Sequence, residues 1–444
     1  MAQQHRIEAL EREVAELKAR LKKDSSNSSK PPSSDPPWKD PAERRQPGKR
    51  KQGGQPGHKG HERRLVEPSE VIELRPSECA HCGEELEGTD ASPSVHQVSE
   101  VPEVVARVTE YRLHSLCCSS CDRRTVATLP TDASQGAFGP RLQAIIALCT
   151  GRFHLSKRAT EELLEDVFGV QISLGAICNV EHAMSGLLKA PAEEALASLH
   201  TAKVVHADET SWAERNRRAW LWVGVTSKAA AFLVRPRRDT QAAQELLGRN
   251  FPGALVTDQF PGYLWVPAAR RQLCWAHLIR HFRGLLDYDG EVKEIGQSLL
   301  DETEKVFDEW HRLRREYRRR DLPSALQPIR ERIASLLRRG AASGHKQLRA
   351  MSKGLLEFEG SLWTFAHRVG VEPTNNAAER ALRSAVLWRK SSFGTQGDRG
   401  SRFVERILTV VTTLRIQGRN VLDFLTQACR NAMVGEAPPR LIGG

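Results

Sequence analysis

Residues 203–212 read KVVHADETSW, and residues 254–263 read ALVTDQFPGY. Each stretch is a short apolar run followed by an acidic residue, a pattern that is typical of a buried strand. Two further β-rich runs, AWLWVGVT and AAAFLVRP, and a helix-like stretch, RRDTQAAQELLGRN, lie between them. The order of three strands, a helix and a strand predicts an α/β domain, which we place at residues 201–395 of a multidomain α/β chain.

Three acidic residues stand out in this domain by their position. We expect Asp208 and Asp258 each to end a strand, and Glu379 to lie on the helix that begins in TNNAAERALR. The neighbouring Glu209 should point away from Asp208, because side chains alternate along a strand. Converging carboxylates are ligands for Mg²⁺ and Mn²⁺, and two such ions about 4 Å apart assist phosphodiester displacement. Strand-end acids that simply face solvent are the commoner alternative.

Helical segments surround this predicted sheet on both sides in the sequence. The long interval between Asp258 and Glu379 requires an insertion, and the helical stretch 275–360 fits one. Residues 131–200 read as helices that either bind DNA or serve as a scaffold, and residues 396–444 read as a helical tail.

The first 65 residues differ in composition from the rest of the chain. Residues 1–24 carry apolar side chains at alternating spacings of three and four, which predicts a coiled-coil helix that needs a partner chain. A solvated surface helix is the alternative. Residues 25–65 form a Ser/Pro linker that continues as a Gly-rich basic arm, either a phosphate-binding segment or a solvated linker. The basic residues of the arm are Arg44, Arg45, Lys49, Arg50, Lys51, Lys59, Arg63 and Arg64.

Residues 66–130 contain two CxxC pairs. Cys79 and Cys82 form the first pair, and Cys118 and Cys121 form the second. Each pair can supply two thiolates from one tight turn, and four thiolates complete the tetrahedral shell of a structural zinc ion. The spacing therefore predicts a small zinc-binding module, and the β-branched residues between the pairs predict strands. Two unrelated buried or redox pairs are the alternative.

Composition and missing motifs exclude several classes of protein. The chain has 444 residues with a net charge of +11, which favours a polyanionic partner such as nucleic acid. It contains no apolar run of membrane-spanning length, no P-loop and no GxSxG elbow. His277 and His281 in CWAHLIRHF could bind a metal, but no carboxylate lies one turn away as in HExxH. Structural or DNA-contacting roles are therefore favoured for both histidines.

The motifs together resemble the transposases of the bacterial insertion-sequence-66 family. The resemblance rests on the N-terminal zipper, KKDSSNSSKPPSSD, GGQPGHKGH, the paired CxxC, HADET, TDQFPGY, CWAHLIRHF and TNNAAERALR, which occur in family order over almost the whole chain. It implies an RNase H-like catalytic core with a helical insertion. The coiled coil, the zinc module and the helical region would precede this core. After Gly394 the chain departs from the family pattern, because IQGRNVLDFL replaces the usual Asn-Gly break.

The resemblance also implies a mechanism and a set of partners. The DDE triad would be Asp208, Asp258 and Glu379, with Asp208 bridging two Mg²⁺ or Mn²⁺ ions. The protein would cleave DNA at the inverted-repeat ends of an insertion sequence and join them to target DNA. It would work in the bacterial cytoplasm at the nucleoid, as a homodimer or higher multimer, with element-encoded accessory proteins as possible partners. Four basic residues beyond Glu379 are candidate phosphate contacts: Arg380, Arg383, Arg389 and Lys390.

Three alternatives remain open from the sequence. The chain could be a non-catalytic, zinc-dependent DNA-binding relic of a transposase, although the intact triad argues against decay. It could be an RNase H-like nuclease that cuts without joining, although the zipper and the basic arm suit a multimeric end-binding complex better. It could also be a scaffold with a zinc knuckle.

Overall fold

The computed structural model describes residues 6–7, 14, 23–24, 27 and 64–443. They belong to two compact units, Met1–Pro37 with Val108–Gly444, and Trp38–Arg107. The predicted coiled coil lies almost entirely outside the described residues, and the predicted linker and basic arm do so apart from Asn27, Arg64 and Leu65. The same holds for seven basic residues of the arm: Arg44, Arg45, Lys49, Arg50, Lys51, Lys59 and Arg63.

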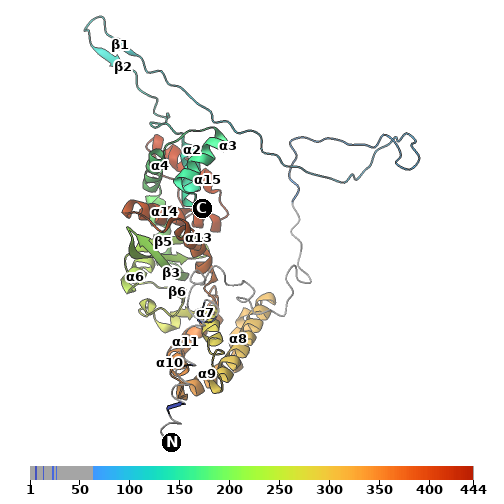
Figure 1. Cartoon of the computed structure of the whole chain (residues 1–444), viewed down its shortest axis with the longest axis vertical. Coiled ribbons are helices and arrows are strands. Elements are labelled where there is room, and N and C mark those ends of the chain that lie inside the picture. Colours follow the sequence, from blue (N-terminus) through green and yellow to red (C-terminus); the bar gives the residue numbers. More distant parts are fainter. Residues whose placement is uncertain (1–5, 8–13, 15–22, 25–26, 28–63, 444) are drawn as a thin grey trace. The chain divides into compact units, whose positions relative to one another are not determined.

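A mixed five-stranded sheet forms the centre of the larger unit (Figure 1). Its strands are β3 (Val204–Glu214), β4 (Arg217–Val225), β5 (Ala230–Arg235), β6 (Ala254–Thr257) and β7 (Arg271–Leu273). Their order is β5-β4-β3-β6-β7. β3, β4 and β5 pair antiparallel, whereas β6 and β7 run parallel to β3. The predicted α/β architecture is confirmed.

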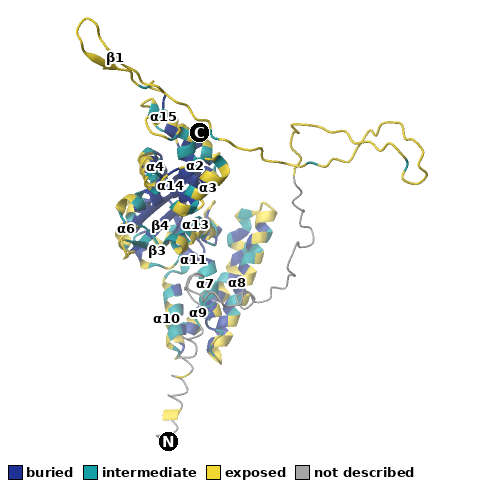
Figure 2. Cartoon of the chain, turned by 45° about the horizontal axis from the view of Figure 1, so that its top comes forward, coloured by how far each residue is buried: buried dark blue, intermediate teal, exposed yellow. Residues whose placement is uncertain are grey.

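Helices cover both faces of this sheet, and the strands between them are buried (Figure 2). The covering helices are α5 (Lys189–His200), α6 (Thr240–Leu247), α13 (Asn376–Ser392) and α14 (Asp398–Ile416). On one face Leu199 and Leu246 pack against Trp222. On the other face Leu382 and Val404 join the cluster around Trp212. Alternating side chains of the strands therefore enter two different cores.

The interval between β7 and α13 is helical, as predicted. Its elements are α7 (Trp275–Arg283), α8 (Glu291–Arg315), α9 (Leu322–Ala342), α10 (Lys346–Glu357), α11 (Glu359–Leu362) and α12 (Thr364–His367). A short 3-10 turn lies at Arg319–Asp321 within this interval. Two others, at Pro261–Tyr263 and Ala268–Arg270, lie between β6 and β7. A separate core with Trp310 and Leu337 holds these helices together, and it reaches the sheet through Val256 and Leu273.

The helices expected between residues 131 and 200 are also present. They are α2 (Pro140–Gly151), α3 (Lys157–Phe168), α4 (Leu174–Leu187) and α5. The last helix of the chain, α15 (Val421–Met433), packs with α2, and Phe424 shares a buried cluster with Ala147 and Met184.

The C-terminal segment is helical, as predicted, and its helix α14 also completes the sheet. β5 is an edge strand, and three of its N–H groups donate to side chains of α14. Ala230 donates to Thr413 Oγ1 at 3.0 Å, and Phe232 donates to Thr409 Oγ1 at 2.9 Å. Val234 donates to a carboxylate oxygen of the same helix. These contacts satisfy donors that an exposed edge would leave open to another chain.

Two predictions about strands are wrong. β3 continues to Glu214, so Asp208 lies within the strand and does not end it. Its continuation pairs with β4 as a long hairpin, in which Glu214 faces Arg217, and this pairing extends the strand beyond the acidic residues. Residues 95–114 form no regular strand, because no neighbouring segment pairs with them among the described residues.

Candidate active site

The sheet register brings the two predicted aspartates together. Val204 pairs with Ala254, and His206 pairs with Val256, in the parallel β3–β6 ladder. The same register continued two residues further places Asp208 level with Asp258. Neighbouring strands lie about 4.8 Å apart, so these two carboxyl groups are neighbours.

Glu379 reaches the same place because the start of α13 is fixed to β3. The Asn375 side chain donates from Nδ2 to the carbonyl oxygen of Ala207 at 2.8 Å, one residue before Asp208. The Asn375 backbone N–H donates to Cys274 Sγ at 3.1 Å. Glu379 lies in the first turn of α13, so these contacts position its carboxylate.

The buried carboxyl groups at this place affect one another's pKa. Burial raises the pKa of Asp208 well above its usual range, and the negative charges of Glu209, Asp258 and Glu379 add to this rise. Burial also raises the pKa of Asp258, although the Phe260 N–H donates to its Oδ1 at 2.9 Å and opposes the shift. A cluster of carboxyl groups whose ionised forms repel one another favours a bound cation.

Glu209 is a fourth acid of the site, and the sequence did not indicate it. Its side chain points to the opposite face from Asp208, as predicted, and is fully buried. The Tyr263 hydroxyl donates to Oε2 at 2.7 Å, and Arg238 Nε donates to Oε1 at 2.7 Å. Arg238 also lies 3.5 Å from Asp258 Oδ2, so one guanidinium bridges two acids. Burial, with the charge of Asp258, raises the pKa of Glu209 to about 7.

The helix α7 adds a histidine and an arginine to the site. His277 Nδ1 and Arg280 Nη2 each lie 3.8 Å from Glu379 Oε1. Burial, together with the positive charge of Arg280, lowers the pKa of His277 to about 4. The sequence shows no carboxylate one turn from His277 on its own helix, whereas the structure supplies one from α13.

A basic cavity of about 880 Å³ lies beside the start of α13. Arg380, Lys203, Lys228 and Arg415 line it, together with the buried His206. None of the four cationic side chains makes an ion pair with another described residue. The cavity can therefore accept an anion such as a DNA phosphate.

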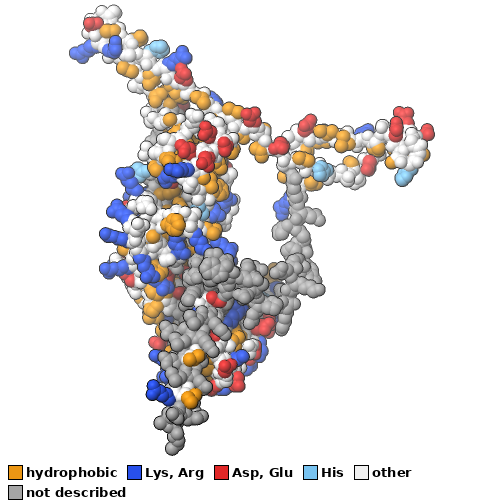
Figure 3. Space-filling view, viewed as in Figure 1, with side chains coloured by type: hydrophobic (Ala, Val, Ile, Leu, Met, Phe, Trp, Pro, Cys, Tyr) orange, Lys and Arg blue, Asp and Glu red, His pale blue; other side chains and the backbone are white. Residues whose placement is uncertain are grey.

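The other predicted basic residues have different surroundings. Arg64, Arg383 and Lys390 are exposed. Arg389 is directed inward, where its guanidinium donates to Thr210 Oγ1 at 3.1 Å and to the carbonyl oxygen of Ser211. Arg389 therefore fastens α13 to β3. On the face shown in Figure 3, Lys and Arg side chains gather beside the sheet near β5 and α6.

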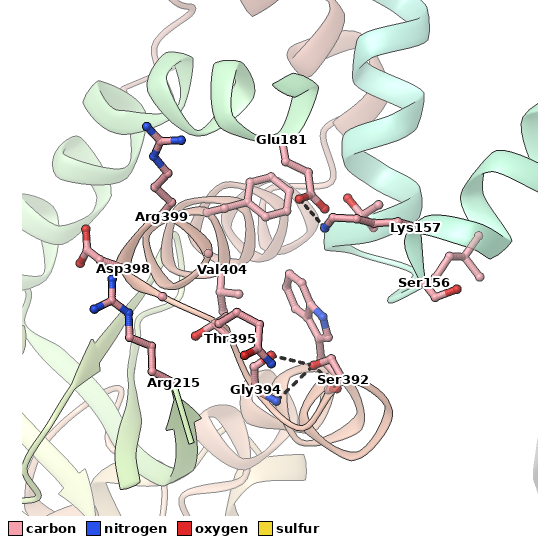
Figure 4. Close-up of a pocket in the computed structure, with 17 residues that line it drawn as sticks. Ser156, Lys157, Glu181, Arg215, Ser392, Gly394, Thr395, Asp398, Arg399 and Val404 are labelled. Carbon is pink, nitrogen blue, oxygen red and sulfur yellow. Dashed lines mark hydrogen bonds and ion pairs between the residues drawn. The ribbon is translucent and has the colours of Figure 1, made fainter. Parts of the chain in front are cut away.

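A second cavity of about 700 Å³ lies at the Gly-rich turn between α13 and α14 (Figure 4). Gly394 has a φ of 103°, and a Cβ there would lie 2.2 Å from the carbonyl oxygen of Ala213, so only glycine fits. Arg215 and Arg399 line the cavity with Lys157, which pairs with Glu181 at 2.8 Å.

The two CxxC pairs form turns with the same backbone hydrogen bonds. In each turn the N–H of the first cysteine donates to the carbonyl oxygen of the residue five positions later. The N–H of the residue four positions later donates to the carbonyl oxygen of that cysteine. All four bonds are 2.8–2.9 Å long. That fourth residue is left-handed in both turns, Gly83 with a φ of 76° and Asp122 with a φ of 57°. Backbone N–H groups lower the pKa of Cys79 and of Cys118. A short hairpin, β1 (Ser115–Cys117) with β2 (Arg124–Val126), flanks the second turn.

The fold and the site define a class: a mixed α/β protein whose central sheet carries clustered carboxylates. The family described as "Transposase IS66 family" matches residues 135–402, which is more than half of the chain. The chain therefore belongs to the IS66 transposase family, as its sequence motifs indicated, and such membership indicates a protein that handles DNA. Residues 2–64 match a separate "Family of unknown function (DUF6444)".

Two relatives from Sinorhizobium fredii (strain NBRC 101917 / NGR234) match most of the chain. "Uncharacterized protein y4qI" is 26% identical over 408 residues, covering 83% of this chain and 73% of the relative. "Uncharacterized protein y4hP" is 25% identical over 397 residues, covering 79% of this chain and 70% of the relative. In the part of the chain that the structure describes, no helix is long and apolar enough to cross a membrane.

Proposed function

We propose that this chain is a DDE-type DNA transposase that cleaves the ends of an insertion sequence and joins them to target DNA. The observation that carries the proposal is the convergence of Asp208, Asp258 and Glu379 from two neighbouring strands and a helix. The sheet supports an RNase H-like core, because β3 lies at its centre between an antiparallel hairpin and two parallel strands. Membership of the transposase family supports the reaction.

The residues present fit a pair of Mg²⁺ or Mn²⁺ ions. Carboxylate oxygens are the ligands that these ions prefer, and Glu379 Oε1 is buried with no hydrogen-bond partner among the described residues. Asp208, whose pKa is raised by the charges of both Asp258 and Glu379, would hold these ions together with those two residues. When bound, the two ions would activate the attacking oxygen and stabilise the leaving oxygen of the phosphodiester.

The surrounding residues would hold these carboxylates in place. Arg238 would fix Asp258 through its bridge to Glu209, and the Tyr263 hydroxyl would fix Glu209 through its hydrogen bond. Arg380 and the basic cavity beside it would bind phosphates of the DNA strand on one side of the scissile bond. Positioning of this kind is a main source of rate in phosphoryl transfer.

The two cysteine turns would hold one structural zinc ion. Four thiolates from paired CxxC turns match the closed shell of such sites, and the lowered pKa values of Cys79 and Cys118 favour the thiolate form. This module and the N-terminal basic arm would bind the inverted-repeat ends, in a homodimer or higher multimer that accessory proteins could assist.

Strand cleavage and joining test the proposal directly. Purified full-length protein is mixed with labelled DNA that carries the element's ends, with Mg²⁺ or Mn²⁺. Wild type should cut at the end and form joined product, whereas Asp208→Asn should do neither. Asp308→Asn, at an exposed aspartate of α8, is the matched control and should keep full activity.

Other outcomes would point to the alternative functions. Metal-dependent cutting without joined product would indicate an RNase H-like nuclease. Specific end binding without any cutting, even with the element's other proteins added, would indicate a DNA-binding relic.

A further inference from the structure

Cys274, His277 and Glu379 form a cluster beside the proposed catalytic acids. One candidate ligand atom from each residue lies within 4.8 Å of the other two. Cys274 directly precedes α7, His277 lies in the first turn of that helix, and Glu379 lies in the first turn of α13. The cluster combines a thiol, an imidazole and a carboxylate, which is a different chemistry from the all-oxygen set of the acidic cluster.

Two atoms of this cluster lack the partners that buried polar atoms normally have. His277 Nδ1 and Glu379 Oε1 are both buried, and neither forms a hydrogen bond with a described residue. They face each other at 3.8 Å, too far for a direct hydrogen bond. Buried groups without partners are costly, so a species placed between them would lower the energy of the site.

We propose that Cys274, His277 and Glu379 bind one thiophilic divalent cation of the Zn²⁺ class. Ligand atoms of a tetrahedral zinc ion lie roughly 3.3–3.8 Å apart, given bonds of about 2.0–2.3 Å. The observed spacing therefore needs only small side-chain movements. Three protein ligands leave the fourth position open, so the ion remains exchangeable and does not serve as a closed structural centre.

The local backbone favours the ionised thiol that such a cation needs. The N–H of Asn375 donates to Cys274 Sγ at 3.1 Å, and Cys274 lies at the N-terminal end of α7, where helix dipoles stabilise a negative charge. Burial acts in the opposite direction and raises the pKa of Cys274 to about 11. A bound cation that displaces the proton would overcome this burial effect.

This site has a consequence for catalysis that rests on the proposed function. Both sites draw on the Glu379 carboxylate, so a Zn²⁺ ion that holds Glu379 toward Cys274 and His277 would weaken Mg²⁺ binding at the acidic cluster. Imidazole and thiolate ligands bind Zn²⁺ far more strongly than Mg²⁺. Low concentrations of Zn²⁺ would therefore inhibit cleavage supported by an excess of Mg²⁺.

Cobalt binding tests the site without any need for activity. Full-length wild type, Cys274→Ser and Cys429→Ser are titrated with Co²⁺, whose thiolate absorption and tetrahedral bands report the ligands. Cys429 is a matched control, because it is also buried and its pKa is likewise raised to about 11. Wild type and Cys429→Ser should bind one more Co²⁺ per chain than Cys274→Ser, while the CxxC turns bind equally in all three.

A second variant keeps the test decisive if Cys274→Ser does not fold, as judged by circular dichroism. His277→Ala should then lose the same single Co²⁺ ion. Equal Co²⁺ counts and equal spectra in wild type and in the folded variants would overturn the proposal, and would leave Arg280 as the charge partner of Glu379. In the cleavage assay, Zn²⁺ should inhibit wild type at least about 10-fold relative to its own zinc-free rate. It should inhibit Cys274→Ser less than about 2-fold relative to the zinc-free rate of that variant, whatever that rate is. A protein without cleavage activity would still give the cobalt result, so the two proposals can fail separately.

Discussion

Each cysteine turn is complete within one short segment, whereas the acidic cluster draws its carboxylates from β3, from the end of β6 and from α13. The turns around Cys79 and Cys118 carry the same hydrogen bonds and the same left-handed residue. Asp208 and Glu379 become neighbours because Asn375 and Arg389 fasten α13 to β3. A turn that lies within one short segment can therefore be predicted from the spacing of its motif. A site whose residues come from several elements depends on the register and the packing of the sheet.

The largest expected effect separates the two proposed metal sites. Cys118→Ser combined with Cys121→Ser should remove one zinc ion per chain, because two thiolates cannot complete the shell. Asp258→Asn should keep that zinc and lose Mn²⁺ binding at the acidic cluster. Metal content of the purified proteins, with Mn²⁺ titration, measures both.

Cys117→Ser is the control for the zinc measurement, since Cys117 precedes the second turn and donates to Asp122 Oδ1 at 3.2 Å. If the double serine variant kept its full zinc content, the paired turns would not be one site.

A smaller effect tests whether the acidic cluster depends on residues that the sequence did not indicate. Arg238→Gln should lower strand cleavage about 10–100-fold, because Asp258 and Glu209 lose their common partner. The neighbouring Arg237 is exposed, and Arg237→Gln should change the rate less than twofold. Equal cleavage rates for the two variants would show that Arg238 does not support the acidic cluster.

The pH dependence of stability tests the burial of the cluster in the metal-free protein. Burial raises the pKa of Glu209 from 4.5 to about 7, so the folded state keeps a proton that the unfolded state releases. The free energy of unfolding should therefore fall as pH rises from about 4.5 to 7. Thermal unfolding measures this slope, and Mn²⁺ should restore stability most strongly above pH 7.

Glu209→Gln should flatten this slope, since the amide does not titrate. An unchanged slope in that variant would mean that other groups control the pH dependence.

The smallest effect concerns the tertiary contacts that complete the sheet. Thr409→Val should lower the free energy of unfolding by about 1–3 kcal/mol, because the N–H of Phe232 loses its acceptor in a buried place. Thr412→Val, at a half-buried threonine of the same helix, should change it by less than about 0.5 kcal/mol. Denaturant unfolding compares the two, and equal losses would indicate that helix propensity, not the edge contact, is being measured.

Much of the molecule could be predicted from local pattern. The apolar runs around HADET and TDQF predicted strands, and the stretch from Trp275 to Glu357 predicted helices. The alternation along β3 correctly placed Glu209 on the face opposite Asp208. The predicted end of β3 was wrong, because the pairing of β3 with β4 continues through polar residues that give no apolar signal.

The sequence by itself determined which residue types are available: paired cysteines within tight turns, three separated acids, and a surplus of basic residues. These features follow from short-range geometry, because turns and strand faces are set by neighbouring residues. Only the tertiary structure decided which side chains meet. The bridge of Arg238 between Glu209 and Asp258, and the approach of His277 and Cys274 to Glu379, join segments far apart in the chain. Such contacts depend on how the sheet and its covering helices pack, and no spacing in the sequence records that packing.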